Sequence, residues 1–536
     1  MRDGQRVGVF RDQDGILHEV IALCTHGQYE LEFDVNGPCW TCPQHGARFA
    51  VDGRVLNGPA IESLEQAFAG SRKDRTVTKK GIAHSVAGDR HPFDYCHREG
   101  MTLRPNPEAA PATELWLTPQ YKKMFSPWIS MRFPPAPTRL TSLFEDHRWQ
   151  GDELMDAVVL SFRQTGMSKG RRMLDQALDD GIGSVSDAQP ELVKLFKQLD
   201  NPPGWFDPEV WERGRQLSNN ASRWGKQAML ANDFLGTFVG REVSQATGQS
   251  GRFRTDPWRR VLESLTWFND VTRPGAVDRR SPVFKDIVRV RLMHAQARAA
   301  LRQEWGDEHF ARHGNPISNS ATMGAAVSFA VLAPLADHAR GRHISVTDLD
   351  AIMSYWSYIA HLMGVADELI PRNAIEALEM VHYLVVTAGG PTEWTADLVN
   401  AACDHGLSEN PLVRRLQIEV IAPVFGLLAA HGGAGLVRAL LQDSPLATVR
   451  LQPWQGIAEA AGQINVLQRR LGDHLPRAEA RTARRAQHGD TQLLVALLGA
   501  LASRNGVSGT PYDHHDTSVE TATGSDEALV SRRVQA

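Results

Sequence analysis

Cysteine is scarce in this chain of 536 residues, and neither acidic nor basic residues are in large excess. So few and such scattered thiols exclude a disulfide framework. The formal net charge is −4, so the chain has no broad basic excess that would attract phosphate groups. We therefore expect neither nucleic acid nor a membrane as a partner. The five cysteines are Cys24, Cys39, Cys42, Cys96 and Cys403.

Long apolar runs, internal repeats and glycine-rich phosphate loops are also missing. The longest apolar run, Met323–Ala336, is interrupted by Ser328 and Pro334 and falls short of the roughly 18 residues that a spanning helix needs. The first residues, Met-Arg-Asp-Gly-Gln-Arg, contain no apolar segment of the kind found in secretory signals. These absences lead us to expect a cytoplasmic protein.

Two short motifs near the N-terminus combine cysteine with histidine. The first has C-x-H spacing and the second C-x-x-H spacing, and a Gly-Pro-Ala loop at 58–60 follows a dozen residues later. This pattern resembles the Rieske ferredoxin domains, and the resemblance covers roughly residues 5–97. It implies a [2Fe–2S] cluster with two thiolates on one iron and two imidazoles on the other. The implied ligands are Cys24, His26, Cys42 and His45.

A zinc ribbon is the alternative, because Cys39 and Cys42 stand at the C-x-x-C spacing that zinc sites use. That alternative leaves His26 or His45 without a role and does not explain the Gly-Pro-Ala loop. With a cluster present, Cys39 is predicted to be a small, buried strand residue.

Fold class follows from how the sequence pattern changes along the chain. Short alternating segments with turn pairs such as Asp14-Gly15 predict a small all-β domain. Eight prolines in the next stretch exclude regular helix there, although Leu115–Leu117 and Trp128–Ile129 should dock on a surface. A 3.6-residue period then predicts a large all-α domain.

The expected division is 1–97 (Rieske domain), 98–140 (proline-rich connector), 141–504 (helical domain) and 505–536 (disordered tail). The clearest predicted helices are 208–227, 257–270, 283–305, 322–339, 346–363 and 373–387.

The helix predicted over 283–305 carries Arg291, His294 and Arg298 on one otherwise apolar face. Two arginines in an apolar stripe are costly to bury unless anions meet them. A haem with its iron on His294 and its carboxylates near the arginines is one solution. Pairing of both arginines with acidic residues of a neighbouring helix is the other, and periodicity alone favours it.

Residues 195–400 resemble the catalytic domain of latex-clearing proteins (rubber oxygenases) and MpaB-type oxygenases. The similarity lies in Val288–Arg298, in Gly314–Asn319 with the small-residue helix after it, and in Trp356–Pro371. The family implies an all-α, globin-reminiscent fold that binds b-type haem, with His294 as the proximal ligand.

The distal side departs from the family pattern. Latex-clearing proteins carry Arg-x-x-Lys-Thr on the helix before the proximal one, whereas Glu263 and Ser264 stand at the lysine and threonine positions here. Arg260, Glu263 and Ser264 are the candidate catalytic residues. A partly buried glutamic acid could pass protons to bound oxygen, or Glu263 could be an ion-pair partner of Arg260 or Arg259. His361 is a further candidate for the cofactor pocket, with a hydrogen-bonded core residue as its alternative.

Two further metal sites receive little support from the sequence. His338 and His343 have the spacing of a mononuclear iron site, but Leu335 stands where the preceding aspartate should be. His514 and His515 lie in the tail predicted to be disordered.

The expected function is a haem-dependent oxygenase that its own Rieske domain supplies with electrons. Its substrates would be dioxygen and an apolar or partly apolar small molecule, and an external reductase or ferredoxin would reduce the cluster. One alternative is an alkene-cleaving dioxygenase with an auxiliary Rieske domain. The other is a non-catalytic electron-transfer or redox-sensing protein.

Overall fold

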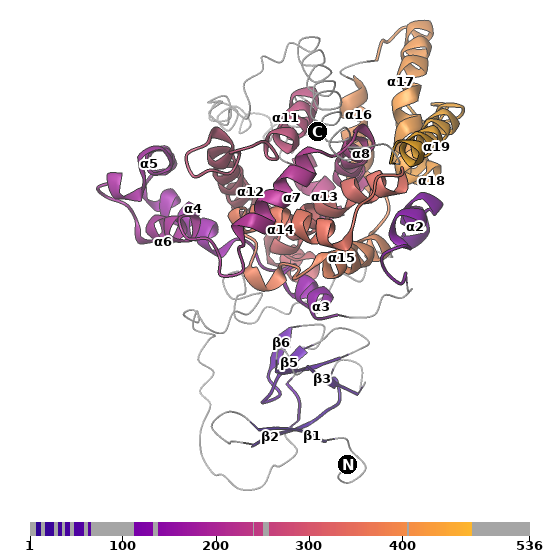
Figure 1. Ribbon diagram of the computed structural model, residues 1–536. Coiled ribbons are helices and arrows are strands. Elements are labelled where there is room, and N and C mark those ends of the chain that lie inside the picture. Colours follow the sequence, from indigo (N-terminus) through magenta and orange to yellow (C-terminus); the bar gives the residue numbers. More distant parts are fainter. Residues whose placement is uncertain are drawn as a thin grey trace, which may run out of the picture.

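The computed structural model shows a small strand-rich part next to a large helical part (Figure 1). The predicted fold class, an all-β Rieske region followed by a large all-α domain, is confirmed. The residues that the structure describes are 7–11, 17–25, 30–34, 38–42, 48–57, 63–65, 112–131, 138–239, 241–249, 257–404 and 407–473.

The strand-rich part contains two antiparallel sheets. Strands β1 (Val7–Arg11) and β2 (Leu17–Ile21) form the first. The second is a meander in the order β3-β4-β5-β6. Its strands are β3 (Glu32–Asp34), β4 (Cys39–Thr41), β5 (Arg48–Ala50) and β6 (Val55–Asn57).

Alternation along these strands separates an apolar face from a polar one. Phe33, Trp40 and Phe49 belong to the small core, and Phe33 stands opposite Trp40, which stands opposite Phe49. Cys39, one position out of step with them, is only 1% exposed. The prediction of a buried strand cysteine is confirmed.

The helical part begins at residue 113 and fills the remainder of the described chain. Its elements are α1 (Thr113–Trp116), α2 (Pro119–Phe125), α3 (Arg139–Asp146), α4 (Glu153–Thr165), α5 (Met167–Asp180), η1 (Ile182–Ser184), α6 (Pro190–Leu199), α7 (Pro208–Asn219), α8 (Arg223–Val239), α9 (Arg241–Gln249), α11 (Pro257–Asp270), α12 (Pro282–His313), α13 (Asn319–Ala339), α14 (Val346–Leu362), η2 (Asp367–Leu369), α15 (Ala374–Thr387), α16 (Glu393–Asp404), α17 (Pro411–Gly432), α18 (Ala434–Leu441) and α19 (Trp454–Asp473).

The stretch 98–140 is less irregular than its prolines suggest, because α1 and α2 lie within it. Pro119 occupies the first turn of α2, where its missing N–H would have no helical partner in any case. The docking prediction is confirmed: Trp116 packs on one core cluster and Trp128 on the main one.

Most of the predicted helices are present with small changes of boundary. The expected helix 208–227 is two helices, α7 and α8, separated at residues 220–222. The predicted helix end at Trp305 is confirmed: Gly306 has a non-helical φ of 76° and ψ of 178°, and α12 resumes as a second helical segment after this kink. The predicted tail lies outside the described residues.

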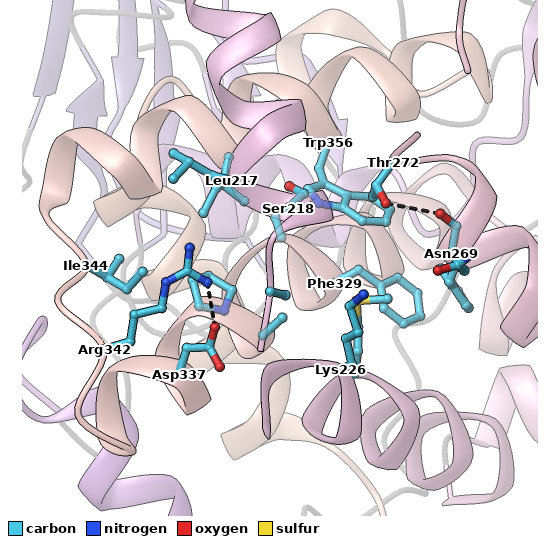
Figure 2. A pocket seen from close by; sticks show the side chains of 17 residues that line it. Leu217, Ser218, Lys226, Asn269, Thr272, Phe329, Asp337, Arg342, Ile344 and Trp356 are labelled. Carbon is cyan, nitrogen blue, oxygen red and sulfur yellow. Dashed lines mark hydrogen bonds and ion pairs between the residues drawn. The ribbon is translucent and has the colours of Figure 1, made fainter. Parts of the chain in front are cut away.

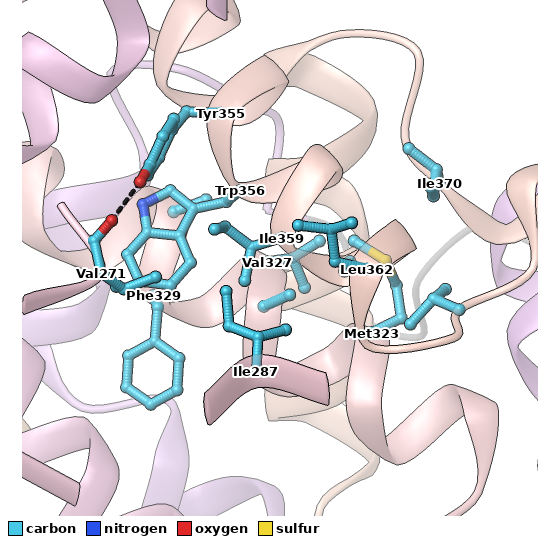
Figure 3. Packing of buried hydrophobic residues seen from close by; sticks show 14 of the residues in the cluster. Val271, Ile287, Met323, Val327, Phe329, Tyr355, Trp356, Ile359, Leu362 and Ile370 are labelled. Atoms are coloured by element: carbon cyan, nitrogen blue, oxygen red, sulfur yellow. Dashed lines mark hydrogen bonds between the residues drawn. The ribbon is translucent and has the colours of Figure 1, made fainter. Parts of the chain in front are cut away.

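The main core surrounds α13, which packs against α14, α8 and α15. Figure 3 shows Ile287 of α12 next to Val327 of α13 and Ile359 of α14. By length and composition α13 could cross a membrane, but 72% of its apolar window is buried inside the protein. That burial is typical of a core helix.

Candidate functional site

The two cysteines of the N-terminal motifs are part of the small core. Cys24 and Cys42 are both 0% exposed and belong to the cluster of Trp40 and Phe49. Their histidine partners, His26 and His45, lie outside the described residues. Buried thiolates at two loop bases are the donors that a Rieske cluster requires on one of its irons.

Both cysteine loops leave the sheet at the same end. Leu23 bridges to Glu30 across the first loop, and Glu32 pairs with Thr41, which pairs with Arg48 across the second. We call this end of the sheet, with Thr41 and Arg48, the cluster end.

Arg48 connects the cluster end to the helical domain. Its Nη2 donates to Cys39 Sγ at 3.3 Å, and its Nη1 donates to Asp146 Oδ2 of α3 at 2.6 Å. Burial raises the pKa of the Asp146 carboxyl to about 6, although Arg48 opposes that shift. Only 5% of the Asp146 side chain is exposed, so this ion pair is shielded from water.

Arg291 is held by an aspartate from another element. The side chain of Asp152, the residue before α4, accepts bonds from Arg291 Nε and, at 2.9 Å, from Nη2. Arg291 Nη1 donates to Gln198 Oε1 at 2.8 Å and to the Leu362 carbonyl at 3.1 Å. The side chain is 1% exposed, and these four hydrogen bonds hold it inside the protein.

Arg298, two turns further along α12, is held in the same way. It donates to both carboxylate oxygens of Asp156 at 2.6 to 3.0 Å and to the Ile317 carbonyl at 2.6 Å. The ion-pair alternative is therefore confirmed for Arg291 and Arg298. Aspartates thus already supply anions to both arginines, and the expectation that they hold haem carboxylates stays a prediction.

His294 lies between the two arginines on α12 and is half-buried. Ile287, on the same helical face, packs among Val327 and Ile359 in the main core (Figure 3). The two ion pairs fix the α12 backbone on either side of His294. The imidazole is therefore placed by a rigid helix, as a metal ligand must be.

The candidate catalytic residues lie on α11, which precedes α12 in the chain. Glu263 is 7% exposed and Ser264 is half-buried, whereas the side chain of Arg260 lies outside the described part. Asp270, at the end of α11, lies close enough to Asp286 to contribute to the raised pKa of that carboxyl. Glu263 precedes Asp270 by seven residues along α11, and His294 follows Asp286 by eight residues along α12. Counted along the chain, Glu263 and His294 are therefore about equally far from the acidic residue near the start or end of their own helix.

His361 does not line the cavity described below. Its Nδ1 pairs with Asp367 Oδ1 at 2.9 Å, and its ring contacts those of Trp205 and Tyr358. It is 5% exposed. Its Nε2 is buried without a hydrogen-bond partner among the described residues, so its assignment to the cofactor pocket stays a prediction.

The mononuclear iron alternative gains no third ligand. His338 and His343 lie close enough for His343 to contribute to lowering the pKa of His338, after burial. Within the described ranges, no group of three or more His, Cys, Asp or Glu side chains is arranged to hold a metal ion.

A cavity lies between α7, α8, α11, α13 and α14 (Figure 2). It is narrow, with an internal volume of about 40 Å³, and it opens to solvent. Phe268, Phe329 and Trp356 form its apolar wall, with the Phe268 and Phe329 ring centroids 4.0 Å apart. His294 and Glu263 are not among its lining residues.

The other end of this cavity is polar, and we did not predict it from sequence. Asp337, 1% exposed, accepts from Arg342 Nη1 at 2.7 Å and from the Ser222 and Gly225 backbone nitrogens at 2.9 and 3.0 Å. Lys226 also lines the cavity (Figure 2). The sequence does contain a signal for this polar end: Asp337 stands near the end of α13, which is otherwise largely apolar.

Comparison with known proteins identifies two domain types. Residues 1–68 match the Rieske [2Fe-2S] domain, and residues 227–455 match the catalytic domain described as ER-bound oxygenase mpaB/B'/Rubber oxygenase. The Bacillus subtilis (strain 168) protein YhfW, named as a Rieske 2Fe-2S iron-sulfur protein, is 47% identical over 64 residues, which are 12% of this chain and 13% of that protein.

The helical domain has relatives of its own. The rubber oxygenase of Streptomyces sp. (strain K30) is 24% identical over 250 residues, 45% of this chain and 59% of that enzyme. The closed-state structure of the latex clearing protein LCP has a TM-score of 0.51 at 19% identity, covering 65% of this chain and 91% of that one. The chain thus spans less than two thirds of the length of these curated relatives.

These matches indicate the class of protein: a chain in which a Rieske iron–sulfur domain is joined to a helical domain similar to the MpaB/rubber oxygenase catalytic domain. The chain carries the Rieske domain at its N-terminus and the MpaB/Lcp-type catalytic domain after it, and the helical fold is that of LCP. Both expected resemblances are confirmed.

Proposed function

We propose that this protein is an electron-fed oxygenase. A cluster on Cys24, His26, Cys42 and His45 supplies electrons to a haem b held by His294. The substrates are dioxygen and an apolar or partly apolar small molecule, and an external reductase or ferredoxin reduces the cluster. One observation carries this proposal: a single chain joins the two buried cluster cysteines to a catalytic domain of oxygenase type.

Electron counting favours this function over reductant-free cleavage of a double bond. Dioxygenolytic cleavage consumes no external electrons, whereas reductive activation of dioxygen with release of one water consumes two. A one-electron donor on the same chain raises its effective concentration at the acceptor. The fusion is therefore useful mainly for the second chemistry.

Haem fits this chain in part. His294 is a half-buried imidazole on a helix whose backbone two buried ion pairs hold, which suits an axial ligand. A role of Arg291 and Arg298 as partners of the propionates stays a prediction, since Asp152 and Asp156 already pair with them. When bound, haem supplies the redox-active iron at which dioxygen is reduced.

The remaining residues have roles that follow from their burial and chemistry. Glu263 is a buried carboxyl on α11, the helix that precedes α12 in the chain, and a buried carboxyl suits proton delivery. The cavity takes the substrate: Phe329 and Trp356 exclude water from an apolar body, and the end near Lys226 and Arg342 can accommodate a polar group.

The direct test is an absorption spectrum of anaerobically purified protein, with iron and haem quantified. We expect a Soret band beside broad iron–sulfur absorption in the wild type. His294→Ala should lose the Soret band and keep two irons per chain. His382→Ala is the matched control, because that buried histidine contacts the Tyr121 hydroxyl and should leave the Soret band unchanged.

Each other outcome has a distinct meaning. Two irons and no Soret band in wild type made with ample haem would contradict the haem site and favour an electron carrier. A third iron without haem would support a mononuclear centre. Product formed at the full rate without any reductant would support the alkene-cleaving dioxygenase.

A further inference from the structure

The polar face of the four-stranded sheet points to the helical domain. Asp34 pairs with Cys39, and Thr41 pairs with Arg48. Side chains two apart along a strand, or paired across strands, share one face. Asp34, Cys39, Thr41 and Arg48 therefore lie on one face, and the contacts of Cys39 with Thr41 Oγ1 at 3.7 Å and with Arg48 at 3.3 Å agree with this.

Helix α3 offers a matching pair of charges to this face. Arg139 and Asp146 are seven residues apart, which places them about 20° apart around the helix and about 10.5 Å apart along it. On the sheet, Asp34 and Arg48 are two strands and two residues apart, a diagonal of about 12 Å. Because the two spacings are similar, Arg48 can face Asp146 while Asp34 faces Arg139.

The signs of these charges fix one orientation. Arg48 contacts Asp146 at 2.6 Å. Arg139 lies 3.7 Å from Glu376 and donates to the Glu368 carbonyl. Burial and Arg372 lower its pKa, Glu376 and Asp34 oppose that shift, and Arg48 makes a smaller lowering contribution, so the sheet face lies within electrostatic reach of Arg139. Turning the sheet by 180° on α3 would bring Arg48 to Arg139 and Asp34 to Asp146. Like charges would then meet in a partly buried interface, which is costly.

The cluster end thereby lies at the C-terminal end of α3, next to the turn 147–152. This turn is bonded to the loop between α12 and α13: the Asn315 and Asn319 backbone nitrogens donate to Arg148 and Gln150 carbonyls at 2.8 and 2.7 Å. Trp149 Nε1 donates to the Phe310 carbonyl at 3.0 Å. The turn ends at Asp152, whose carboxylate holds Arg291, three residues before His294.

We propose that the sheet face with Asp34 and Arg48 and the α3 face with Arg139 and Asp146 form an intramolecular docking interface. It holds the cluster end against the turn 147–152, so that electrons pass within one chain. Arg48 and Asp146 are positioning residues: they set the place of the cluster and do not touch substrate or cofactor.

The electron step rests on the proposed function, whereas the docking does not. In that step a cluster on Cys24, His26, Cys42 and His45 would supply one electron at a time to a haem on His294. The external reductase or ferredoxin would replace each electron that the cluster passes on. No bond between the domains forms or breaks.

Hydrogen exchange of the full-length, cluster-loaded protein tests the docking. We would compare residues 138–152 in wild type, Arg48→Gln, Asp146→Asn and the double variant. Each single variant should raise exchange in this segment about fivefold or more, and the double variant should match the singles, because all three remove one contact. Small-angle scattering should show a larger radius of gyration in all three.

Asp175→Asn is the matched control, since it removes the Arg289–Asp175 pair inside the helical domain and should leave 138–152 unchanged. Unaltered cluster absorption and circular dichroism show that each variant folds. If Asp146→Asn does not fold, Arg48→Gln carries the comparison alone. Exchange and radius equal to wild type in folded Arg48→Gln would overturn the proposal.

Mixing two inactive proteins separates transfer within a chain from transfer between chains. Cys42→Ala lacks the cluster and His294→Ala lacks the haem. Their mixture should stay below about one tenth of wild-type turnover at equal concentration, and restored turnover would overturn the single-chain route. Absence of haem from the wild type would contradict the proposed function alone, and the exchange experiment would still decide the docking.

Discussion

The two parts of this molecule differ in what occupies their cores. In the Rieske region, two core residues are the cluster cysteines themselves, Cys24 and Cys42, packed with Trp40 and Phe49. In the helical domain, the main core consists of apolar residues, and His294 stands at the edge of it, half-buried. Metal binding is thus expected to be part of folding in the first region, whereas the haem that we propose would be added to an already complete core in the second.

The largest expected effect of this difference is on the Rieske region. Cys42→Ala should abolish the cluster and unfold residues 39–57, because a domain this small depends on its metal site for stability. The melting temperature of the helical domain should change by less than about 2 °C. Hydrogen exchange with iron analysis measures both.

Cys39→Ala is the matched control, three residues away and equally buried. It should keep both irons, because Cys39 contacts Arg48 and Thr41 and is not an expected ligand. Loss of the metal in Cys39→Ala would instead support the zinc ribbon.

The helical domain should be most sensitive at its buried charges. Arg291→Met leaves Asp152 buried without its partner and should reduce the free energy of unfolding by about 3–5 kcal/mol. Asp175→Asn, which breaks a half-exposed pair with Arg289, should cost at most about 1 kcal/mol. Denaturant titration followed by circular dichroism measures both. Equal losses would show that the buried pair of Arg291 is no more stabilising than the half-exposed pair of Arg289.

A smaller effect should appear on acidification. Burial, and then Arg340, lower the pKa of His431 from 6.5 to about 4. Between these values the unfolded chain binds the proton more tightly than the folded one, so stability falls as pH drops from about 6.5 to 4. The loss should be roughly 1–3 kcal/mol and should shrink in His431→Gln. A pH dependence identical in wild type and variant would contradict this assignment.

Local motifs were predictable from the sequence, whereas long-range partners were not. Cys24 and Cys42 carry their own spacing, and α11 and α14 show helical periods with clear start signals such as the Ser345 capping box. The partner of Arg291 lies 139 residues away in the chain, so spacing could not choose between a cofactor and an aspartate.

Other errors have local physical causes. The helices of the proline-rich stretch were missed because Pro119 was counted as a helix breaker, although it occupies the first turn of α2. The cavity beside Asp337 was missed because its walls come from five separate helices. The docking of Arg48 on Asp146 joins residues 98 positions apart, and no periodic pattern connects them.

The central claim is that the cluster passes electrons to a haem on the same chain. Anaerobic stopped-flow absorption tests it, with oxidised protein mixed with a reductase–ferredoxin pair that reduces only the cluster quickly. We predict bleaching of the cluster followed by a shift of the Soret band at a rate independent of protein concentration, with the second phase absent in Cys42→Ala. Haem reduction at the same rate in wild type and Cys42→Ala would contradict the account.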